Sequence, residues 1–429
     1  MKRSFQKSNL FFNHVSKIIP LASQTFSKSY LQYVQGVSPL FITRGKGAYI
    51  WDVDGNKYID FINGLLPVIL GYQYSAVDSA IKRQLKKGIS FSLASPLEYE
   101  LATLLKKHIP CAEMVRFGKN GSDVTTGAIR LARAITGRDH IIVCGYHGWH
   151  DWYIGTTSRK LGVPKSTQKL SHTFSYNDIG SLESLFKKYP NKIAAVIMEP
   201  MHYIDPRDNF LQQVKTLTHK NGALLIFDEI VTGFRFSLGG AQKLFGVIPD
   251  LATFGKSMAN GMPISVLVGK RKYMKAIEDI FYSFTFGGET LSIAAAIATI
   301  KEIENKKVIP YLWKIGTYLQ KNTNKLIKRH GLSDAISVRG KPCLQEVLIE
   351  DTRHSTSYEI RSFIQQELIQ QGILWLGQHN LSFSHTKKDM DFLLSAYDEI
   401  FKCLQAVLDT GTLKKHLEGE PITNIFKVR

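Results

Sequence analysis

Residues 251–261 have the sequence LATFGKSMANG, in which a short apolar run ends at Phe254 and a polar turn with Lys256 follows. Strands that are apolar on both faces and alternate with helices are typical of a mostly parallel sheet covered on both sides. Similar apolar runs, with helical patterns between several of them, recur at Ile141–Cys144, Ile193–Met198, Ala223–Phe227 and Ile264–Val268. The sequence therefore predicts an α/β domain.

Two further regions flank this domain. Residues 47–62, GAYIWDVDGNKYIDFI, predict two strands joined by a turn at Asp54 and Gly55. After about residue 300 a charged helical pattern covers Ile300–Ile327, and a closing helix is predicted over Lys388–Leu408. We expect a large domain and a smaller α+β domain built from both termini. The expected bounds are 1–62 for the N-terminal segment, 63–300 for the large domain and 301–429 for the C-terminal part.

The composition argues against several classes of protein. The chain has 429 residues and a formal net charge of +19, but its basic residues are dispersed. Dispersed charge disfavours a nucleic-acid partner and fits an anionic substrate or cofactor. No run approaches the roughly 20 apolar residues of a membrane span, so no membrane partner is expected. The four cysteines lie far apart without a Cys-x-x-Cys pair, which favours a cytoplasmic protein over a disulfide framework or zinc site.

The tripeptide Gly255-Lys256-Ser257 resembles the end of a phosphate-binding P-loop. That motif requires a glycine five positions before Gly255, where Asp250 stands, so a nucleotide triphosphatase is disfavoured. A lysine at the end of a buried strand has another use. Burial disfavours its ammonium form, and the neutral amine is a nucleophile that forms Schiff bases.

Pyridoxal phosphate (PLP) binds such a lysine and requires further groups around it. A carboxylate must pair with its ring nitrogen, and Asp228 follows an apolar strand. Gly121 and Ser122, at a predicted helix start, offer N–H groups and the helix dipole to the phosphate. Tyr146 offers an aromatic face for stacking. Each residue alone has a simpler explanation as a helix cap, a strand-end carboxylate or core packing, but their combination indicates a PLP site.

Over nearly its whole length the chain resembles the class III, fold type I PLP-dependent aminotransferases. Within that family it is most similar to the glutamate-1-semialdehyde aminomutases and to related aminotransferases of surface-polysaccharide clusters. The resemblance implies the fold type I PLP-transferase fold, PLP as cofactor and a homodimer with shared active sites. The segments that carry it are GAYIWDVDGNKYIDF (47–61), AIRLARAITGRDHIIVCGYHGWHD (128–151), VIMEP (196–200), LLIFDEIVTGFR (224–235), GGAQKLFGVIPDLATFGK (239–256) and SFTFGGETLS (283–292).

The resemblance implies a role at the cofactor for residues on several strands. Lys256 corresponds to the lysine that holds the cofactor covalently, and Asp228 to the partner of the ring nitrogen. Tyr146 corresponds to the residue that stacks on the ring. Glu199 and Ile230 match positions near the ring.

The resemblance also implies a phosphate site. It consists of Gly121 and Ser122 together with Asn120, which stands where the family usually has serine. Thr285 matches a threonine that reaches the phosphate of the neighbouring subunit.

His147, next to the stacking tyrosine, is also expected near the cofactor. With His150 and Asp151 it raises the possibility of a zinc site, because two histidines and a carboxylate can bind that metal. The His-x-x-His spacing is not a recognised zinc pattern, so we expect no metal.

Three segments depart from the aminomutases, and all three concern the substrate. The aminomutases carry an arginine for the substrate carboxylate near the N-terminus, whereas Ser23–Lys28 contains none. The loop after the Tyr-His-Gly motif is shorter, passing from Thr156 to Gly162–Lys165 without a Gly-Ser-Gly insertion. The segment Gly377–His385 lacks the glutamate that the aminomutases place nearby.

We therefore expect an aminotransferase that moves an amino group from an amino acid donor to a carbonyl substrate. Lys256 is expected to move the proton as general acid and base, and cell-surface polysaccharide synthesis is one role that the resemblance suggests. The first alternative is a glutamate-1-semialdehyde 2,1-aminomutase. The second is a non-catalytic protein of the same fold, which would be expected to lack Lys256 or Asp228, although both are present.

Overall fold

The computed structural model describes residues 3–423. Within them the chain forms two compact units, one of residues 75–309 and one of residues 3–74 with 310–423. In that part of the chain no helix is both long and apolar enough to cross a membrane.

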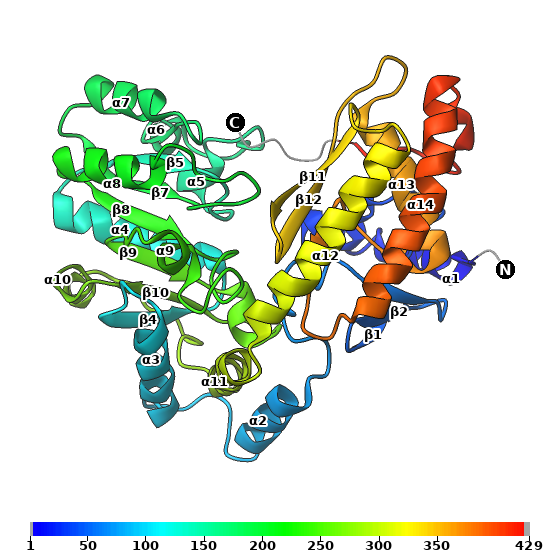
Figure 1. Ribbon diagram of the computed structural model, residues 1–429. Helices are drawn as coiled ribbons and strands as arrows, with labels where there is room; N and C mark the ends of the chain where they lie inside the picture. The colour runs from blue at the N-terminus through cyan, green and yellow to red at the C-terminus, as the bar shows by residue number, and fades with distance from the viewer. Residues whose placement is uncertain (1–2, 424–429) are drawn as a thin grey trace. The chain divides into compact units, whose positions relative to one another are not determined.

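The larger unit, 75–309, is built on a seven-stranded sheet with the strand order β4-β10-β9-β8-β7-β5-β6 (Figure 1). Neighbouring strands from β9 to β6 are parallel, and β10 is antiparallel to both β9 and β4. The predicted mostly parallel sheet is therefore confirmed. Its strands are β4 (Met114–Gly118), β5 (His140–Cys144), β6 (Ser171–Thr173), β7 (Ile193–Met198), β8 (Leu224–Asp228), β9 (Leu251–Phe254) and β10 (Ser265–Gly269).

The strands are apolar because both faces of the sheet are covered. Every residue of β7, β8, β9 and β10 is buried, which is the pattern expected of central strands between two layers of helices. The strand directions also determine where the strands end. Because β10 alone reverses between β9 and β4, the carboxyl ends of β4, β5, β7, β8 and β9 lie at one edge of the sheet.

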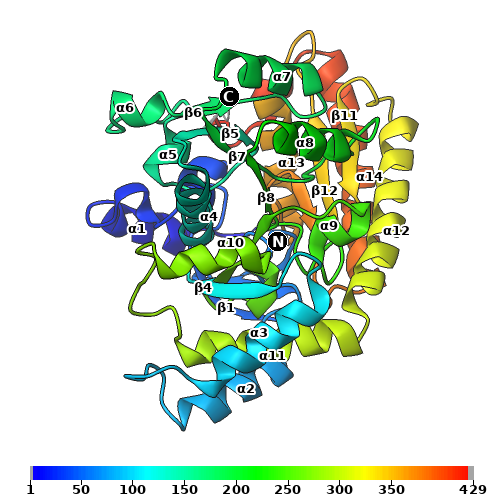
Figure 2. The ribbon, with the colours of Figure 1, turned by 90° about the vertical axis from the view of Figure 1, so that its left-hand side faces the viewer.

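Helices of the larger unit pack on this sheet and on one another. The helix after β4 buries Val124, Ala128, Leu131 and Ala132, which share one helical face, in the core cluster with the strands. Helices α2, α3 and α11 lie side by side (Figure 2). The helices are α2 (Ser75–Leu85), α3 (Pro96–His108), α4 (Gly121–Thr136), α5 (Asp151–Ile154), α6 (Lys165–Gln168), α7 (Ile179–Lys188), α8 (Phe210–Lys220), α9 (Gly240–Phe245), η4 (Lys256–Ala259), α10 (Arg271–Met274), η5 (Lys275–Glu278) and α11 (Thr290–Asn305).

The smaller unit contains the predicted hairpin. Strands β2 (Tyr49–Asp52) and β3 (Lys57–Asp60) pair antiparallel, and Gly55 in the turn between them has a φ of 90°, which glycine adopts readily. Strand β13 (Ile373–Leu374) pairs in parallel with β3, so the hairpin joins the C-terminal part of the chain as expected. The remaining strands are β1 (Ile42–Lys46), β11 (Ile336–Lys341), β12 (Leu344–Ile349) and β14 (Gln378–Asn380).

The predicted helix over Ile300–Ile327 is two helices in the structure. Helix α11 ends at Asn305, and α12 begins at Val308 after Lys307, which has a φ of 51°. A left-handed residue cannot continue an α-helix, and periodicity does not reveal such a break. The helices of the smaller unit are α1 (Gln6–Val15), η1 (Pro20–Ala22), η2 (Phe26–Lys28), η3 (Tyr30–Gln32), α12 (Val308–Arg329), α13 (Ser357–Gln371), α14 (Lys387–Asp409) and η6 (Leu413–His416).

A histidine pair lies at the β6 edge of the larger unit. Nε2 of His172 lies 2.8 Å from Nδ1 of His140, and the His172 ring stacks on Tyr189 at 4.1 Å between centroids. Burial, followed by the nearby charges of His140 and Lys188, lowers the pKa of His172 to about 4. Below its ordinary pKa of about 6.5 the unfolded chain binds a proton that the folded chain excludes until about pH 4.

We predict that stability is lost as the pH falls from 6.5 toward 4, and that His172→Gln reduces this loss. The difference should be about 1 kcal/mol between pH 7 and pH 5, allowing for the partial exposure of the ring. Thermal unfolding of both proteins at the two pH values measures it. An equal fall in melting temperature for wild type and variant would contradict the prediction.

Candidate active site

Polar residues from several elements gather at the carboxyl edge of the large sheet. Asp228 is the last residue of β8, and Lys256 is the second residue after β9. Glu199 follows β7 directly, and Tyr146 is the second residue after β5. In open α/β sheets ligands bind at this edge, because parallel strands bring their ends together there.

The carboxylate of Asp228 is almost completely buried and accepts hydrogen bonds on both oxygens. Nδ1 of His147 lies 2.8 Å from Oδ2, while the amide of Ile230 and the hydroxyl of Thr253 donate to Oδ1 at 3.1 and 3.3 Å. A carboxylate has about four acceptor positions. These three donors therefore hold Asp228 in place and leave capacity for one more.

His147 is itself positioned by two oxygens. Its Nε2 lies 3.2 Å from the carbonyl oxygen of Cys144, opposite the contact with Asp228. Both ring nitrogens thus face oxygen atoms, so the orientation of the His147 ring depends on Asp228, and that of the Asp228 carboxylate on His147.

Lys256 has an unusual backbone and a perturbed amine. It begins η4 with a φ of 37°, in the left-handed region that a non-glycine residue enters at a cost of about 1 kcal/mol or more. Burial lowers the pKa of its amine, whereas the negative charges of Glu199 and Asp228 act in the opposite direction. The residue as a whole is partly exposed.

Tyr146 presents a ring at the same edge. Its side chain is 48% exposed, and its ring meets that of Tyr153 edge-on at 5.5 Å. The amide of Tyr146 donates to Oε2 of Glu199 at 3.0 Å, which connects the ends of β5 and β7. Burial, followed by the charges of Asp228 and Glu199, raises the pKa of Tyr146. The half-exposed ring of Tyr146 therefore lies beside two carboxylates at this edge.

The start of α4 offers backbone donors. Asp123 accepts the amides of Lys119 and Asn120 on Oδ2, at 3.1 and 2.7 Å. The amides of Gly121 and Ser122 have no acceptor within residues 3–423. Two free N–H groups at the positive end of a 16-residue helix make this turn a candidate anion site.

Ile230 connects this anion site with the strand that leads to Lys256. A Cβ atom on Gly121 would lie 3.4 Å from the Ile230 side chain, and one on Gly255 would lie 3.2 Å from it. The loop after β5 also closes on α4, since a Cβ atom on Gly148 would come within 2.2 Å of Ser122 Oγ. The expected site residues on β5, β7, β8, β9 and α4 are therefore brought together.

Thr285 and His150 take no part in the contacts described so far. Thr285 is exposed in the segment between η5 and α11, and none of the hydrogen bonds described above involves it. His150 contacts Thr126 through Nδ1 at 2.7 Å, whereas His147 faces Asp228, so the two histidines serve separate contacts. Among the described residues no group of three His, Cys, Asp or Glu side chains is arranged to hold a metal ion.

Sequence reasoning missed two residues that hold the edge together. Thr253 was not selected, but its register opposite Asp228 across β8 and β9 puts its hydroxyl on the carboxylate. Glu229 is fully buried and accepts the amides of Ala241 and Gln242 at the start of α9. Burial raises the pKa of Glu229 to about 7. The Asp-Glu pair after an apolar strand was the available signal for Glu229, and none marked Thr253.

This donor set fits PLP. The free amides of Gly121 and Ser122 suit a phosphate, and the remaining acceptor capacity of Asp228 suits a protonated ring nitrogen. Tyr146 suits the ring face, and the amine of Lys256 suits the aldehyde. When bound, PLP supplies an electron sink, while the protein supplies orientation and charge.

Comparison with known proteins gives the class. The family model Aminotransferase class-III matches residues 32–393, and the chain belongs to this family. The resemblance inferred from the motifs is thereby confirmed, as are the fold type I architecture and PLP as the cofactor. The chain is a PLP-dependent aminotransferase-family enzyme.

Two relatives and one solved structure are similar to this chain over most of its length. The chain is 35% identical to a 3-aminobutyryl-CoA aminotransferase of Cloacimonas acidaminovorans, covering 93% of this chain and 97% of the relative. It is 33% identical to glutamate-1-semialdehyde 2,1-aminomutase 2 of Lachnoclostridium phytofermentans, covering 92% and 99%. The PLP form of the FumI protein of Sphingopyxis sp. MTA144 has 29% identity and a TM-score of 0.88, covering 94% and 98%.

We predict that Asp228→Asn keeps the cofactor bound but slows turnover by about 100-fold or more, because a neutral side chain no longer holds a positive charge on the ring nitrogen. Thr253→Val is the matched control, since it removes one donor to the same carboxylate and keeps the charge. Its loss should be much smaller. Steady-state rates and the cofactor absorbance of both variants decide the matter, and undiminished turnover in Asp228→Asn would disprove the role.

Proposed function

We propose that this chain transfers an amino group between an amino acid donor and a small carbonyl compound, with Lys256 as the residue that holds PLP and moves the proton. The observation that carries the proposal is the meeting of a lysine amine of lowered pKa, a buried carboxylate and two free helix amides at one sheet edge. A neutral amine accepts a proton from a substrate carbon and returns it elsewhere.

The remaining residues have supporting roles in this proposal. Tyr146 stacks on the ring, and Ile230 packs against it from the side of Gly121 and Gly255. Glu199 fixes the Tyr146 backbone and balances the charge of the amine. His147 orients Asp228.

We further propose a homodimer. Thr285 is exposed, which leaves it accessible to the phosphate of a neighbouring subunit, as the family resemblance implies. We assign the two compact units as the domains of the enzyme, with the site residues named above on the larger one. A cytoplasmic location remains a prediction from the cysteine pattern, and a role in surface polysaccharide synthesis a prediction from the resemblance.

The alternative is a glutamate-1-semialdehyde aminomutase, the activity named for several relatives at 32–36% identity. An aminomutase must retain its substrate while the amine moves, which calls for an anchor for the substrate carboxylate. Ser23–Lys28 offers one cation and no arginine. That cation, Lys28, is exposed. It lies close enough to the buried carboxylate of Asp60 for its charge to lower the pKa of Asp60, against the larger effect of burial, which raises it.

We predict that borohydride fixes PLP to Lys256 and that Lys256→Ala abolishes this attachment. Lys243→Ala, a change of an exposed lysine on α9, should leave the attachment intact. Peptide mapping after reduction identifies the modified residue. Modification of any other lysine would show that the assignment is wrong.

We also predict little or no conversion of glutamate-1-semialdehyde to 5-aminolevulinate, together with a measurable half-reaction with a free amino donor. Glutamate and 3-aminobutyryl-CoA are the donors to test first, the second because of the relative described above. Cofactor absorbance follows the half-reaction. Efficient formation of 5-aminolevulinate that is weakened in Lys28→Ala would favour the aminomutase, because a lone ammonium would then serve as the anchor.

A further inference from the structure

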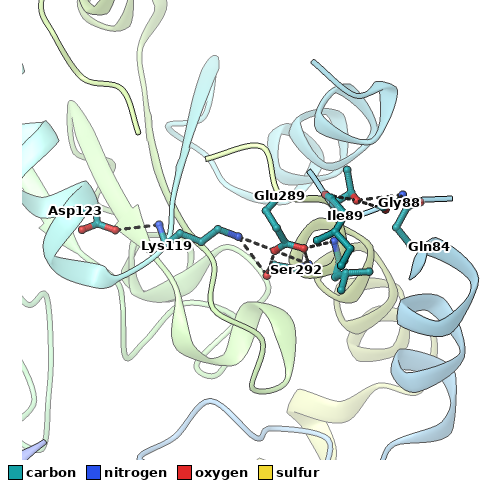
Figure 3. Close-up of polar contacts among 9 residues, drawn as sticks. Gln84, Gly88, Ile89, Lys119, Asp123, Glu289 and Ser292 are labelled. Carbon is teal, nitrogen blue, oxygen red and sulfur yellow. Dashed lines mark hydrogen bonds and ion pairs between the residues drawn. The ribbon is translucent and has the colours of Figure 1, made fainter. Parts of the chain in front are cut away.

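The turn before α4 is tied to α11 by a partly buried ion pair. Nζ of Lys119 lies 2.8 Å from Oε2 of Glu289 and 3.3 Å from Oγ of Ser292 (Figure 3). The Lys119 and Glu289 side chains are 16% and 12% exposed. Surface ion pairs contribute little, but a pair this enclosed is weakly screened by solvent.

Glu289 is fixed independently of Lys119. Its carboxylate caps α11, accepting the amide of Leu291 at 2.5 Å and the amide and hydroxyl of Ser292 at 3.2 and 2.6 Å. Burial raises the pKa of Glu289, but the hydrogen bonds from Lys119 and Ser292 outweigh it and lower that pKa. The carboxylate is therefore a rigid, charged anchor for the lysine.

The next residue, Thr290, anchors the same helix end to the chain after α2. Its amide donates to the carbonyl of Ile89 at 2.9 Å, and its hydroxyl to the same oxygen at 2.8 Å. The side chain of Gln84 donates to the Thr290 hydroxyl at 3.1 Å. It also donates to the carbonyl of Gly88 at 3.1 Å, and Figure 3 labels Gln84 and Gly88. These hydrogen bonds fix the start of α11 to α2 and to the chain that follows it.

Lys119 is fixed at its backbone as well as at its amine. Its amide donates to Asp123, and the carbonyl of Asn120 accepts the hydroxyl of Ser265 at 2.7 Å (Figure 3 shows the Asp123 contact). The ion pair therefore connects the turn at 119–122 to α11. Helix α11 also packs against η4, whose first residue is Lys256.

The phosphate of PLP is joined by a short CH2–O linker to the same ring that carries its aldehyde, so the anion site and the lysine must keep a separation within a narrow range. We propose that Lys119 and Glu289 are positioning residues that hold the Gly121–Ser122 anion site in register with Lys256 through α11. The inference rests on the proposed roles of that anion site and of Lys256. It assigns Lys119 no contact with the cofactor.

The test is a double-mutant cycle with Lys119→Met, Glu289→Gln and the double variant, measured as the dissociation constants of PLP and of pyridoxal, which lacks the phosphate. Glutamine at 289 keeps an oxygen that can cap α11. Each single change should weaken PLP binding by about 10-fold while leaving pyridoxal binding unchanged, and the double variant should be no weaker than either single one. The control is Lys107→Met, which removes the same charge as Lys119→Met. It breaks the more exposed ion pair between Lys107 of α3 and Glu304 of α11 and should change neither dissociation constant.

Two outcomes of the cycle would overturn the inference: equal weakening of PLP and pyridoxal binding, or additive losses in the double variant. Tighter PLP binding in Glu289→Gln would overturn it as well, because it would show that Lys119, released from Glu289, attracts the phosphate by its charge and does not act by positioning the turn. Failure of the proposed function looks different. In that case wild type itself shows no preference for PLP over pyridoxal.

Discussion

The larger unit must supply hydrogen-bond donors to one buried carboxylate, that of Asp228. Asp228 ends a strand whose every residue is enclosed, and an uncompensated charge there would cost several kcal/mol. Its donors come from three places: the β8 loop, the neighbouring strand β9 and the loop after β5. Each is available only if β9 pairs in the observed register and the loop after β5 folds back over the edge. The charge of Asp228 therefore couples the strand order to the geometry of the site.

The same edge shows how a parallel sheet assembles a site from distant segments. Residues 121, 146, 199, 228 and 256 are spread over more than a hundred positions, and the sheet brings the strand ends that precede them to one line. Close packing between these ends relies on missing side chains. At Gly255 an added Cβ would press on Ile230, and at Gly148 it would collide with Ser122. Glycine at 148 also adopts a φ of 104°, which other residues rarely reach.

Much of the fold was accessible from local pattern. Apolar runs predicted β5, β7, β8, β9 and β10, and the Asp54-Gly55 turn predicted the hairpin, because strand burial and turn conformation depend on near neighbours in sequence. Pattern failed at Lys306–Lys307, where a break between α11 and α12 follows from a single left-handed residue. It also did not identify Thr253 and Glu229, whose importance arises from cross-strand register and from the start of α9.

By itself the sequence determined the α/β class, the family and the chemical types of the site residues, because order and spacing of motifs such as LLIFDEIVTGFR and GGAQKLFGVIPDLATFGK are preserved in the chain. The tertiary structure decided what each group faces. It left the amides of Gly121 and Ser122 free while Asp123 took those before them, and it turned Lys119 toward Glu289, 170 positions away. Such contacts form only when α11 lies beside the turn before α4, a relation that no local pattern of residues encodes.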